Sequence, residues 1–212
     1  VVLMPQSFGP FNYAGRLSEE EIKKTLSECF AIFARENSGF YLLKDRLKLL
    51  NVRKSFDLVL AEKKVDYSLV FKNSPEDVEL PSLDNNNRYV GIIPNFMTLL
   101  HDSRIRDWAI NVYLRIIEIL RKHPYTPVLI PHAVRDIEIC VQIKQKALAS
   151  EEIMLIDTVL PSYKYQELCK RLDFIIASRY HSIVHAYKEA TPAVILGWAE
   201  KYQELAHAMG QE

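Results

Sequence analysis

The chain has 212 residues, 49% of them hydrophobic and 25% charged, and its formal net charge is zero. This composition is typical of a globular protein with enough apolar residues for one large domain or two small ones. The zero net charge excludes the global basic field that draws proteins to nucleic acid, so we expect no nucleic-acid partner. We also expect no integral membrane segment, because no apolar stretch is long enough to span a bilayer. No signal peptide is recognisable.

Three cysteines, Cys29, Cys140 and Cys169, are scattered within helical patterns. Their odd number argues against a disulfide framework, and their spacing matches no metal site. We therefore expect no bound metal, and reduced thiols in a cytoplasmic location. The chain opens at Val1 within a strand-like run and without an initiator methionine. We therefore also expect the natural chain to begin further upstream.

The first part of the chain alternates short apolar runs with helical patterns. Ser18 followed by Glu21 is a capping-box signal, which predicts a helix from there to about residue 35. A second helical pattern covers residues 46–56. The apolar runs predict short strands over residues 1–4, 40–43 and 58–60.

Residues 73–88 contain two prolines and an acidic, asparagine-rich stretch, which indicates an interdomain linker. Five strand–helix units follow in series. The predicted strands cover residues 89–93, 128–130, 153–156, 174–177 and 193–196, and the predicted helices cover 103–122, 135–149, 163–172, 182–190 and 200–209. Such a series implies a doubly wound parallel sheet. We therefore predict an α/β protein with a partial N-terminal domain (1–83) and a C-terminal domain (84–212).

Polar residues directly follow several of these predicted strands. They are Asn95, His132, Asp157 and the tetrapeptide Ser178-Arg179-Tyr180-His181. The carboxyl ends of parallel strands meet at one edge of a sheet, where open α/β sheets bind ligands. Taken singly, Asp157 and Ser178 also fit helix N-caps, and His132 fits a histidine at the edge of the core. Taken together, they predict a cleft.

Arg179 and His181 fall in the first turn of the helix predicted behind strand 174–177. A helix N-terminus favours an anion through its N–H groups and its dipole. Arg179 adds a planar fork suited to carboxylate or phosphate, and His181 adds a group that can move a proton near neutral pH. The alternative is a surface ion pair at Arg179 and a helix-end histidine without a role.

Other signals indicate no site. The chain has no glycine-rich phosphate loop and no HExxH, CxxC or GxSxG element, which argues against a P-loop enzyme, a zinc protease and an α/β-hydrolase. In the predicted helix 103–122, we expect five residues to belong to the core: Trp108, Val112, Leu114, Ile116 and Ile117.

A series of segments resembles the polysaccharide pyruvyl transferase family. In chain order they are PQSFGPF (5–11), GIIPN (91–95), LIPH (129–132) with Asp136, SRYHS (178–182), TP (191–192), GW (197–198) and KY (201–202). The match spans nearly the whole chain, and the Arg-x-His element is its most specific part. The resemblance implies two Rossmann-like domains arranged as in B-type glycosyltransferases, with an active cleft between them. The glycine-rich opening of the family's first domain is missing, so the resemblance also implies an incomplete N-terminal domain.

The family's activity is transfer of pyruvate from phosphoenolpyruvate to sugar hydroxyls, which forms a cyclic ketal on a surface polysaccharide or its precursor. The resemblance implies that Arg179 and His181 contact the donor. Transfer needs an acid that protonates the methylene carbon of the donor; His181 is our first candidate and His132 our second. The other predicted binding residues are Ser178, Tyr180, Asn95, Gln6, Ser7 and Lys201. We expect no cofactor, with phosphoenolpyruvate as the donor substrate and a saccharide as the acceptor.

Two other functions stay open. One is a nucleotide-sugar glycosyltransferase or epimerase of the same architecture, with Glu189 and Glu200 as candidate ribose ligands. The other is a non-catalytic module that binds an anion or a sugar. Binding of a uridine diphosphate sugar instead of phosphoenolpyruvate would distinguish the first from a pyruvyl transferase. Binding without turnover would distinguish the second. The sequence specifies neither the acceptor sugar, nor the linkage, nor the oligomeric state.

Overall fold

The computed structural model describes residues 1–11, 17–61, 79–100, 102–197 and 199–211. By their contacts, the residues group into two units, one of residues 1–65 with 198–212 and one of residues 66–197. The C-terminal residues therefore group with the N-terminal ones. The division into domains of residues 1–83 and 84–212 stays a prediction. Trp198 and residues 73–78 of the predicted linker lie outside the described residues.

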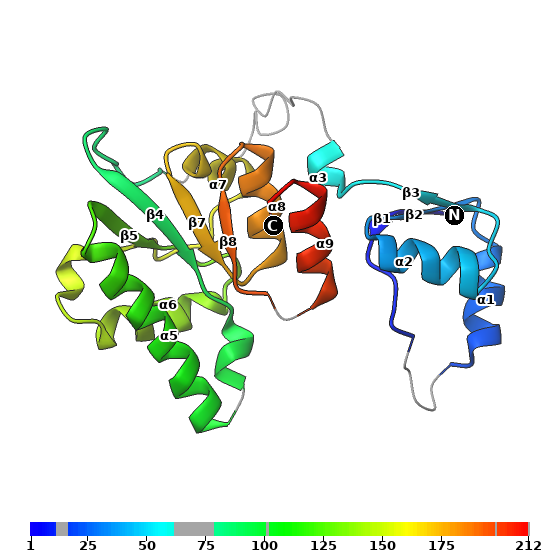
Figure 1. Cartoon of the computed structure of the whole chain (residues 1–212), viewed down its shortest axis with the longest axis horizontal. Helices are drawn as coiled ribbons and strands as arrows, with labels where there is room; N and C mark the ends of the chain where they lie inside the picture. The colour runs from blue at the N-terminus through cyan, green and yellow to red at the C-terminus, as the bar shows by residue number, and fades with distance from the viewer. Residues whose placement is uncertain (12–16, 62–78, 101, 198, 212) are drawn as a thin grey trace. The chain divides into compact units, whose positions relative to one another are not determined.

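The first unit contains a three-stranded sheet in the order β1-β2-β3, and both pairs of strands are parallel. Figure 1 shows these strands with α1 and α2 beside them. The elements are β1 (Val2–Gln6), α1 (Glu19–Ser27), β2 (Ala31–Ala34), α2 (Asn37–Tyr41), the π-helical η1 (Leu42–Arg46), β3 (Val52–Lys54), α3 (Leu58–Ala61) and α9 (Glu200–Ala208).

The capping box predicted from the sequence is present at the start of α1. The backbone N–H of Glu21 donates to Oγ of Ser18, and its carboxylate accepts from the backbone N–H of Ser18. Ile22 on the inner face of α1 then packs with Ile32 of β2 and with Leu43 and Leu47. These contacts form the core of the first unit.

In the first unit one predicted helix ends too late, and three other predicted elements are wrong. The predicted helix to residue 35 ends at Ser27 and is followed by strand β2, because the helical spacing of Ile22, Leu26, Phe30 and Phe33 continues by chance into the strand. The run 40–43 is helical, not extended. Residues 46–56 contain strand β3, and residues 58–60 belong to helix α3.

The second unit is a five-stranded sheet in the order β6-β5-β4-β7-β8, with every pair of neighbouring strands parallel. The strands are β4 (Arg88–Ile93), β5 (Tyr125–Leu129), β6 (Met154–Leu155), β7 (Phe174–Ala177) and β8 (Ala193–Ile195). The helices are η2 (Phe96–Leu100), α5 (Ser103–Arg121), α6 (Asp136–Lys146), η3 (Ser150–Glu152), α7 (Ser162–Cys169) and α8 (Tyr180–Lys188). The predicted α/β class with a doubly wound parallel sheet is confirmed.

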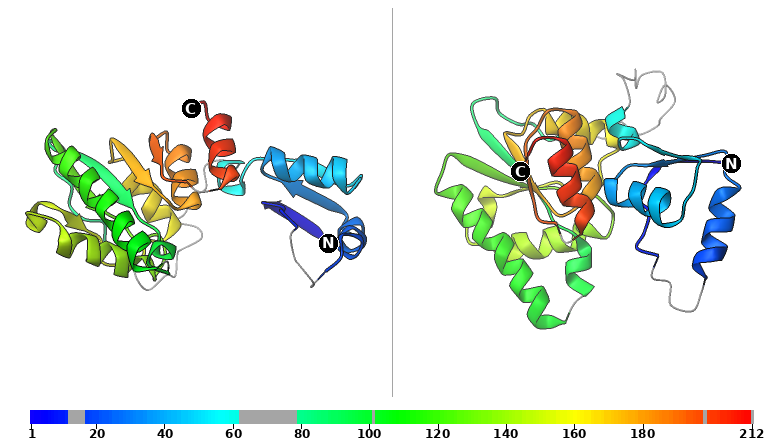
Figure 2. Two further views of the ribbon diagram at one scale, coloured as in Figure 1. Left: turned by 60° about the horizontal axis from the view of Figure 1, so that its bottom comes forward. Right: turned by 45° about the vertical axis from the view of Figure 1, so that its right-hand side comes forward.

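Helices cover both faces of this sheet (Figures 1 and 2). On one face α5 and α6 lie side by side, and Ile117 and Ile139 pack on Val90 and Leu129. On the other face α8 packs on β7 and α7. Gly91 in the central strand β4 permits close packing there, because a Cβ atom at this position would lie 2.9 Å from Cδ1 of Leu172.

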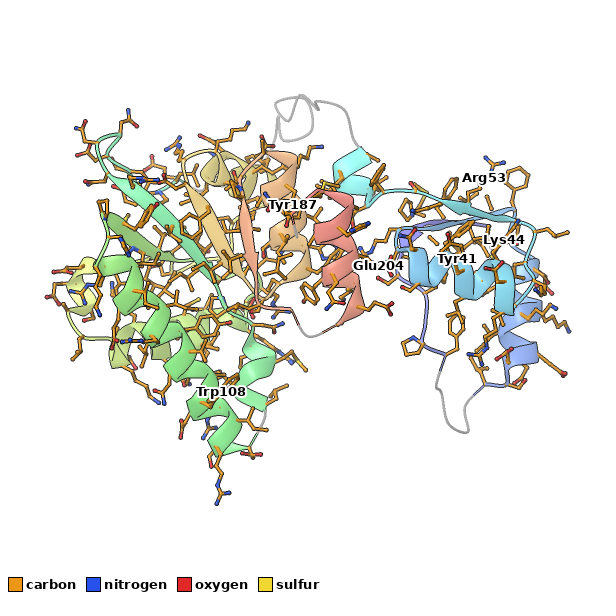
Figure 3. All side chains as sticks on the ribbon, viewed as in Figure 1. Tyr41, Lys44, Arg53, Trp108, Tyr187 and Glu204 are labelled. Atoms are coloured by element: carbon orange, nitrogen blue, oxygen red, sulfur yellow. The ribbon has the colours of Figure 1, made fainter. Side chains whose placement is uncertain are left out.

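Trp108 does not belong to the core, contrary to the prediction. It is 67% exposed on α5 and is labelled in Figure 3. The buried residues of that helix are Ile110, Tyr113, Ile117 and Leu120. Trp108 precedes Ile110 by two positions, which rotates it about 200° around the helix and away from the sheet. Ile117 is buried as predicted.

Candidate functional site

The order of the strands reverses between β4 and β7. From β4 the chain moves outward through β5 and β6, then returns to place β7 on the other side of β4. In open α/β sheets this switch point is where ligands bind, outside the carboxyl ends of the strands. Asn95 follows β4 and Ser178 follows β7, so two predicted site residues flank the switch point.

Ser178 and Asn95 are buried and joined to the ends of these strands. Oγ of Ser178 donates to the carbonyl oxygen of Ile93 over 3.2 Å and accepts from the hydroxyl of Tyr113 over 3.1 Å. Oδ1 of Asn95 accepts from the backbone N–H of Met97 over 2.9 Å, and its Nδ2 lies 3.5 Å from the carbonyl oxygen of Ser178. Both side chains therefore shape the loops at the switch point.

Asp136 holds the three loops of the site together. It is fully buried at the start of α6. Its Oδ1 accepts from the backbone N–H of Phe96 over 2.8 Å, and its Oδ2 accepts from that of Ala133 over 2.9 Å. Nε of Arg179 donates to Oδ2 over 2.9 Å, and Nη2 of Arg179 donates to Oδ1. One carboxylate thus joins the loops after β4, β5 and β7.

Arg179 is the N-cap residue of α8, and its side chain is 26% exposed. Asp136 engages the Nε and Nη2 edge of the guanidinium group. Within the described residues, no carboxylate lies against Nη1. Half of the planar fork is therefore committed to the protein, and the remaining N–H groups stay available for an anion.

Asp136 was not among the predicted site residues. The sequence placed it only in the segment with family resemblance. Its position in the first helical turn after a strand was a signal for a site residue. That signal is weak, because acidic residues near a helix N-terminus have an ordinary explanation in the helix dipole.

His132, which follows β5, lies in a cluster of aromatic rings. Its ring centroid is 5.2 Å from that of Tyr165 and 6.1 Å from that of His185. Nδ1 of His185 lies 2.9 Å from Nε2 of Gln166. Burial, reinforced by the charges of His185 and His181, lowers the pKa of His132 from about 6.5 to about 4. His132 is therefore neutral at pH 7.

His181 and Tyr180 occupy the first turn of α8 with different exposures. Tyr180 is buried, whereas His181 is exposed, and their rings meet edge to face with centroids 5.6 Å apart. His181 and Arg179 both act electrostatically on His132. One edge of the second unit therefore brings together six of the predicted site residues: Asn95, His132, Ser178, Arg179, Tyr180 and His181. Asp157 is exposed after β6.

The other three predicted site residues belong to the first unit. Gln6 ends β1, and its carbonyl oxygen accepts from the backbone N–H of Arg35 over 3.3 Å. Oγ of Ser7 donates to Oε1 of Glu36 over 2.8 Å. Lys201 lies in the first turn of α9, where burial and the charge of Arg35 lower its pKa against the opposing effect of Glu36.

The side chain of Arg35 donates hydrogen bonds to Ser7, Glu36 and Asp57. These four residues lie at the ends of strands and are here called the Arg35 cluster. Arg35, Glu36 and Asp57 were not among the predicted site residues. The signal existed, because Arg35 and Glu36 directly follow β2 and Asp57 follows β3. The mistaken helix to residue 35 concealed it, since it placed Arg35 at a helix end.

Within the described part of the chain, no three His, Cys, Asp or Glu side chains gather as a metal ion would need. Among the described helices, none combines the length and the apolar composition that a membrane crossing requires.

The fold and the switch-point residues define an α/β protein of the Rossmann-like class with an arginine at a helix N-terminus. The polysaccharide pyruvyl transferase family model matches residues 1–200. The chain therefore belongs to the polysaccharide pyruvyl transferase family. No curated protein matches the chain.

Solved structures with a similar fold include those of a UDP-GlcNAc 2-epimerase and of a second protein in complex with UDP. The Methanocaldococcus jannaschii enzyme in complex with UDP-GlcNAc and UDP has a TM-score of 0.51 at 16% identity, over 84% of this chain and 48% of that one. A second structure of that enzyme gives a TM-score of 0.53 at 16% identity, over 91% and 54%. The S. aureus MnaA–UDP structure gives 0.53 at 13% identity, over 87% and 47%. The chain thus spans about half the length of these structures, and the likeness concerns the fold.

Proposed function

We propose that the protein transfers a pyruvyl group from phosphoenolpyruvate to two hydroxyls of a saccharide, forming a pyruvate ketal on a surface polysaccharide or its precursor. The observation that carries this proposal is the guanidinium group of Arg179. Asp136 fixes one edge of it, and the remaining N–H groups lie at the N-terminus of α8 beside the switch point. Membership of the family supports pyruvyl transfer as the reaction.

The charges of the donor match this arrangement. Phosphoenolpyruvate carries a carboxylate and a phosphate close together. The positive end of the α8 dipole and the remaining donors of Arg179 favour such an anion. The bidentate contact with Asp136 orients the guanidinium group before the donor binds, which reduces the entropy that binding must overcome.

The reaction needs one proton donor and two proton acceptors. An acid protonates the methylene carbon of the donor, and the cation that forms at the neighbouring carbon is attacked by a sugar hydroxyl. Phosphate then leaves, and the second hydroxyl closes the ketal. Each hydroxyl loses one proton: one of these protons regenerates the acid, and the other leaves with the phosphate. His132 is neutral at pH 7 and therefore carries no proton to give to the donor. The exposed His181 is therefore the proposed acid.

The test compares Arg179→Lys with His181→Gln in the full-length protein. An ammonium group cannot reproduce the paired contacts of the guanidinium group, so Arg179→Lys should weaken phosphoenolpyruvate binding by about one to two decades. His181→Gln keeps a side chain that can hydrogen-bond to the donor, but the amide cannot transfer a proton at neutral pH. Binding should therefore persist while turnover falls roughly 10²–10⁴-fold. Calorimetry with phosphoenolpyruvate and a phosphate-release assay measure the two effects.

Arg115→Lys, an exposed exchange on α5, is the matched control and should change neither quantity. If His181→Gln turns over at the wild-type rate, His181 is not the acid, and the acid role passes to another group of the site.

A nucleotide-sugar enzyme is the second candidate, favoured by the likeness of the fold to a UDP-GlcNAc 2-epimerase. Calorimetry with UDP-GlcNAc separates the two. A wild-type protein that binds UDP-GlcNAc and ignores phosphoenolpyruvate would refute pyruvyl transfer. A protein that binds phosphoenolpyruvate without any turnover would instead be a binding module.

A further inference from the structure

The Arg35 cluster lies at the carboxyl ends of β1, β2 and β3 in the first unit. Ser7 follows β1, Arg35 and Glu36 follow β2, and Asp57 follows β3. Nε of Arg35 donates to Oε1 of Glu36 over 2.7 Å, Nη1 donates to Oδ2 of Asp57 over 2.7 Å, and Nη2 donates to Oγ of Ser7 over 2.9 Å. The edge of a parallel sheet that binds ligands in α/β proteins is therefore polar in this unit too.

The two oxygens of Glu36 differ in their partners. Oε1 accepts hydrogen bonds from Ser7 and from Arg35. Oε2 is buried, and no group among the described residues donates to it. The side chain is only 4% exposed. Leaving a buried carboxylate oxygen unpaired is costly, so such an atom calls for a donor that the protein itself does not supply.

The charges of the cluster select the chemistry of that donor. Each of the three guanidinium nitrogens already has a partner, and Glu36 and Asp57 balance the charges of Arg35 and Lys201. An anion would find no uncommitted positive charge on Arg35 and would be repelled by Glu36. A neutral hydroxyl fits, since it can donate to Oε2 without adding charge.

We propose that Oε2 of Glu36 accepts a hydrogen bond from a hydroxyl of the saccharide acceptor, which makes Glu36 an acceptor-binding residue at the end of β2. The identity of the ligand as the acceptor rests on the proposed pyruvyl transfer. The unpartnered Oε2 of Glu36 is an observation that does not depend on the reaction.

The experiment compares Glu36→Gln with Asp57→Asn in the full-length protein. Both exchanges remove one negative charge and weaken one hydrogen bond to Arg35, so they are matched in their effect on the cluster. The probes are the methyl glycosides of glucose, galactose and mannose, titrated by calorimetry, and phosphoenolpyruvate is titrated separately.

We expect Glu36→Gln to weaken the best-bound glycoside about tenfold, because a charge-assisted hydrogen bond becomes a neutral one. Asp57→Asn should change that affinity less than about twofold. Neither variant should change the affinity for phosphoenolpyruvate. Equal effects of the two variants on the glycoside would overturn the proposal, as would a wild-type protein that binds none of the three glycosides.

A second measurement does not depend on the folding of one variant. The 2-, 3-, 4- and 6-deoxy forms of the best glycoside should show one hydroxyl whose loss costs the wild type about tenfold in affinity. Glu36→Asp, which draws the carboxylate back by one methylene group, should reduce that difference. If all four deoxy sugars bind the wild type as well as the parent does, no hydroxyl meets Glu36.

The outcomes separate this site from the proposed function. A protein that binds a glycoside through Glu36 but does not bind phosphoenolpyruvate refutes pyruvyl transfer and leaves the hydroxyl site standing. A protein that binds and turns over phosphoenolpyruvate with unchanged acceptor affinity in Glu36→Gln refutes the site alone.

Discussion

Among single residues, Asp136 has the most partners at the switch point, with four donors from three loops. Asp136→Asn keeps the shape but replaces one acceptor oxygen with a donor that faces an N–H group. Breaking a buried ion pair on one side typically costs about 3–5 kcal/mol. We therefore expect the free energy of unfolding in urea to fall by that amount, and phosphoenolpyruvate affinity to fall with it.

Glu138→Gln is the control for Asp136→Asn, since Glu138 is exposed in the same first turn of α6. It should change the free energy of unfolding by no more than about 0.5 kcal/mol. A loss below about 1 kcal/mol in Asp136→Asn would mean that the pair with Arg179 is not a structural anchor.

His132 gives stability a dependence on pH. Because burial lowers its pKa to about 4 in the folded chain, from about 6.5 when unfolded, the folded state binds the proton more weakly. The contribution of His132 is complete above pH 6.5 and is lost as the pH falls towards 4. Between pH 7 and pH 5 this amounts to about 2 kcal/mol.

His132→Gln should remove that part of the loss, measured as the free energy of unfolding in urea at the two pH values. His123→Gln, at the exposed end of α5, controls for the removal of a histidine as such. If His132→Gln loses as much stability as the wild type between pH 7 and pH 5, His132 is already charged or solvated in the folded protein.

At the scale of elements, β4 depends on the absence of a side chain at Gly91. A Cβ atom there would meet Leu172 at 2.9 Å, Ile130 at 3.1 Å and Ile175 at 3.2 Å. Overpacking of this kind typically costs about 1–3 kcal/mol. We expect Gly91→Ala to lie at the low end, because two of these contacts are ends of flexible side chains, and Gly91→Val to cost more. If urea unfolding shows Gly91→Val to be as stable as the wild type, Leu172, Ile130 and Ile175 can move aside without cost.

The elements of the second unit could be predicted because each has the length and spacing of its type. Residues 103–122 carry a long helical pattern, and their predicted bounds differ from those of α5 by one residue. In the first unit the elements are short. Residues 40–43 look like a strand, yet Leu43 and Leu47 are buried one helical turn apart. A four-residue apolar run does not distinguish the two structures.

The site was predictable only in part for a related reason. Position after a strand identified Asn95, His132 and Arg179, since it follows from chain order alone. Asp136 and Glu36 act through contacts between distant segments, such as the pair between Asp136 and Arg179. No local pattern records which carboxylate a guanidinium group will face, so these roles required the fold.

At the scale of the whole molecule, the three thiols report on the two units separately. Burial raises the pKa of Cys140 and raises that of Cys169 to about 12, so neither forms the reactive thiolate in the folded protein. Cys29, in the first unit, is partly exposed. A thiol reagent at pH 8 should label Cys29 rapidly, and the two buried thiols only in denaturant.

Peptide mapping after labelling at increasing guanidinium concentration checks this. Fast labelling of Cys140 or Cys169 without denaturant would mean that the second unit opens readily under native conditions. The single variant Cys29→Ser provides the control, since its only remaining thiols are the two buried ones.

The central position of β4 has a consequence for how the protein reaches its structure. The hydrogen bond from the backbone of Tyr89 to Asp173, beside the β4–β7 pair, joins residues 84 positions apart. Chains whose contacts are far apart in sequence fold slowly, because the entropy of closing a long loop is lost before the stabilising contacts form. During synthesis β4, β5 and β6 emerge well before β7. Until β7 pairs, the apolar edge of β4 is open to wrong partners, including the same strand of a neighbouring nascent chain.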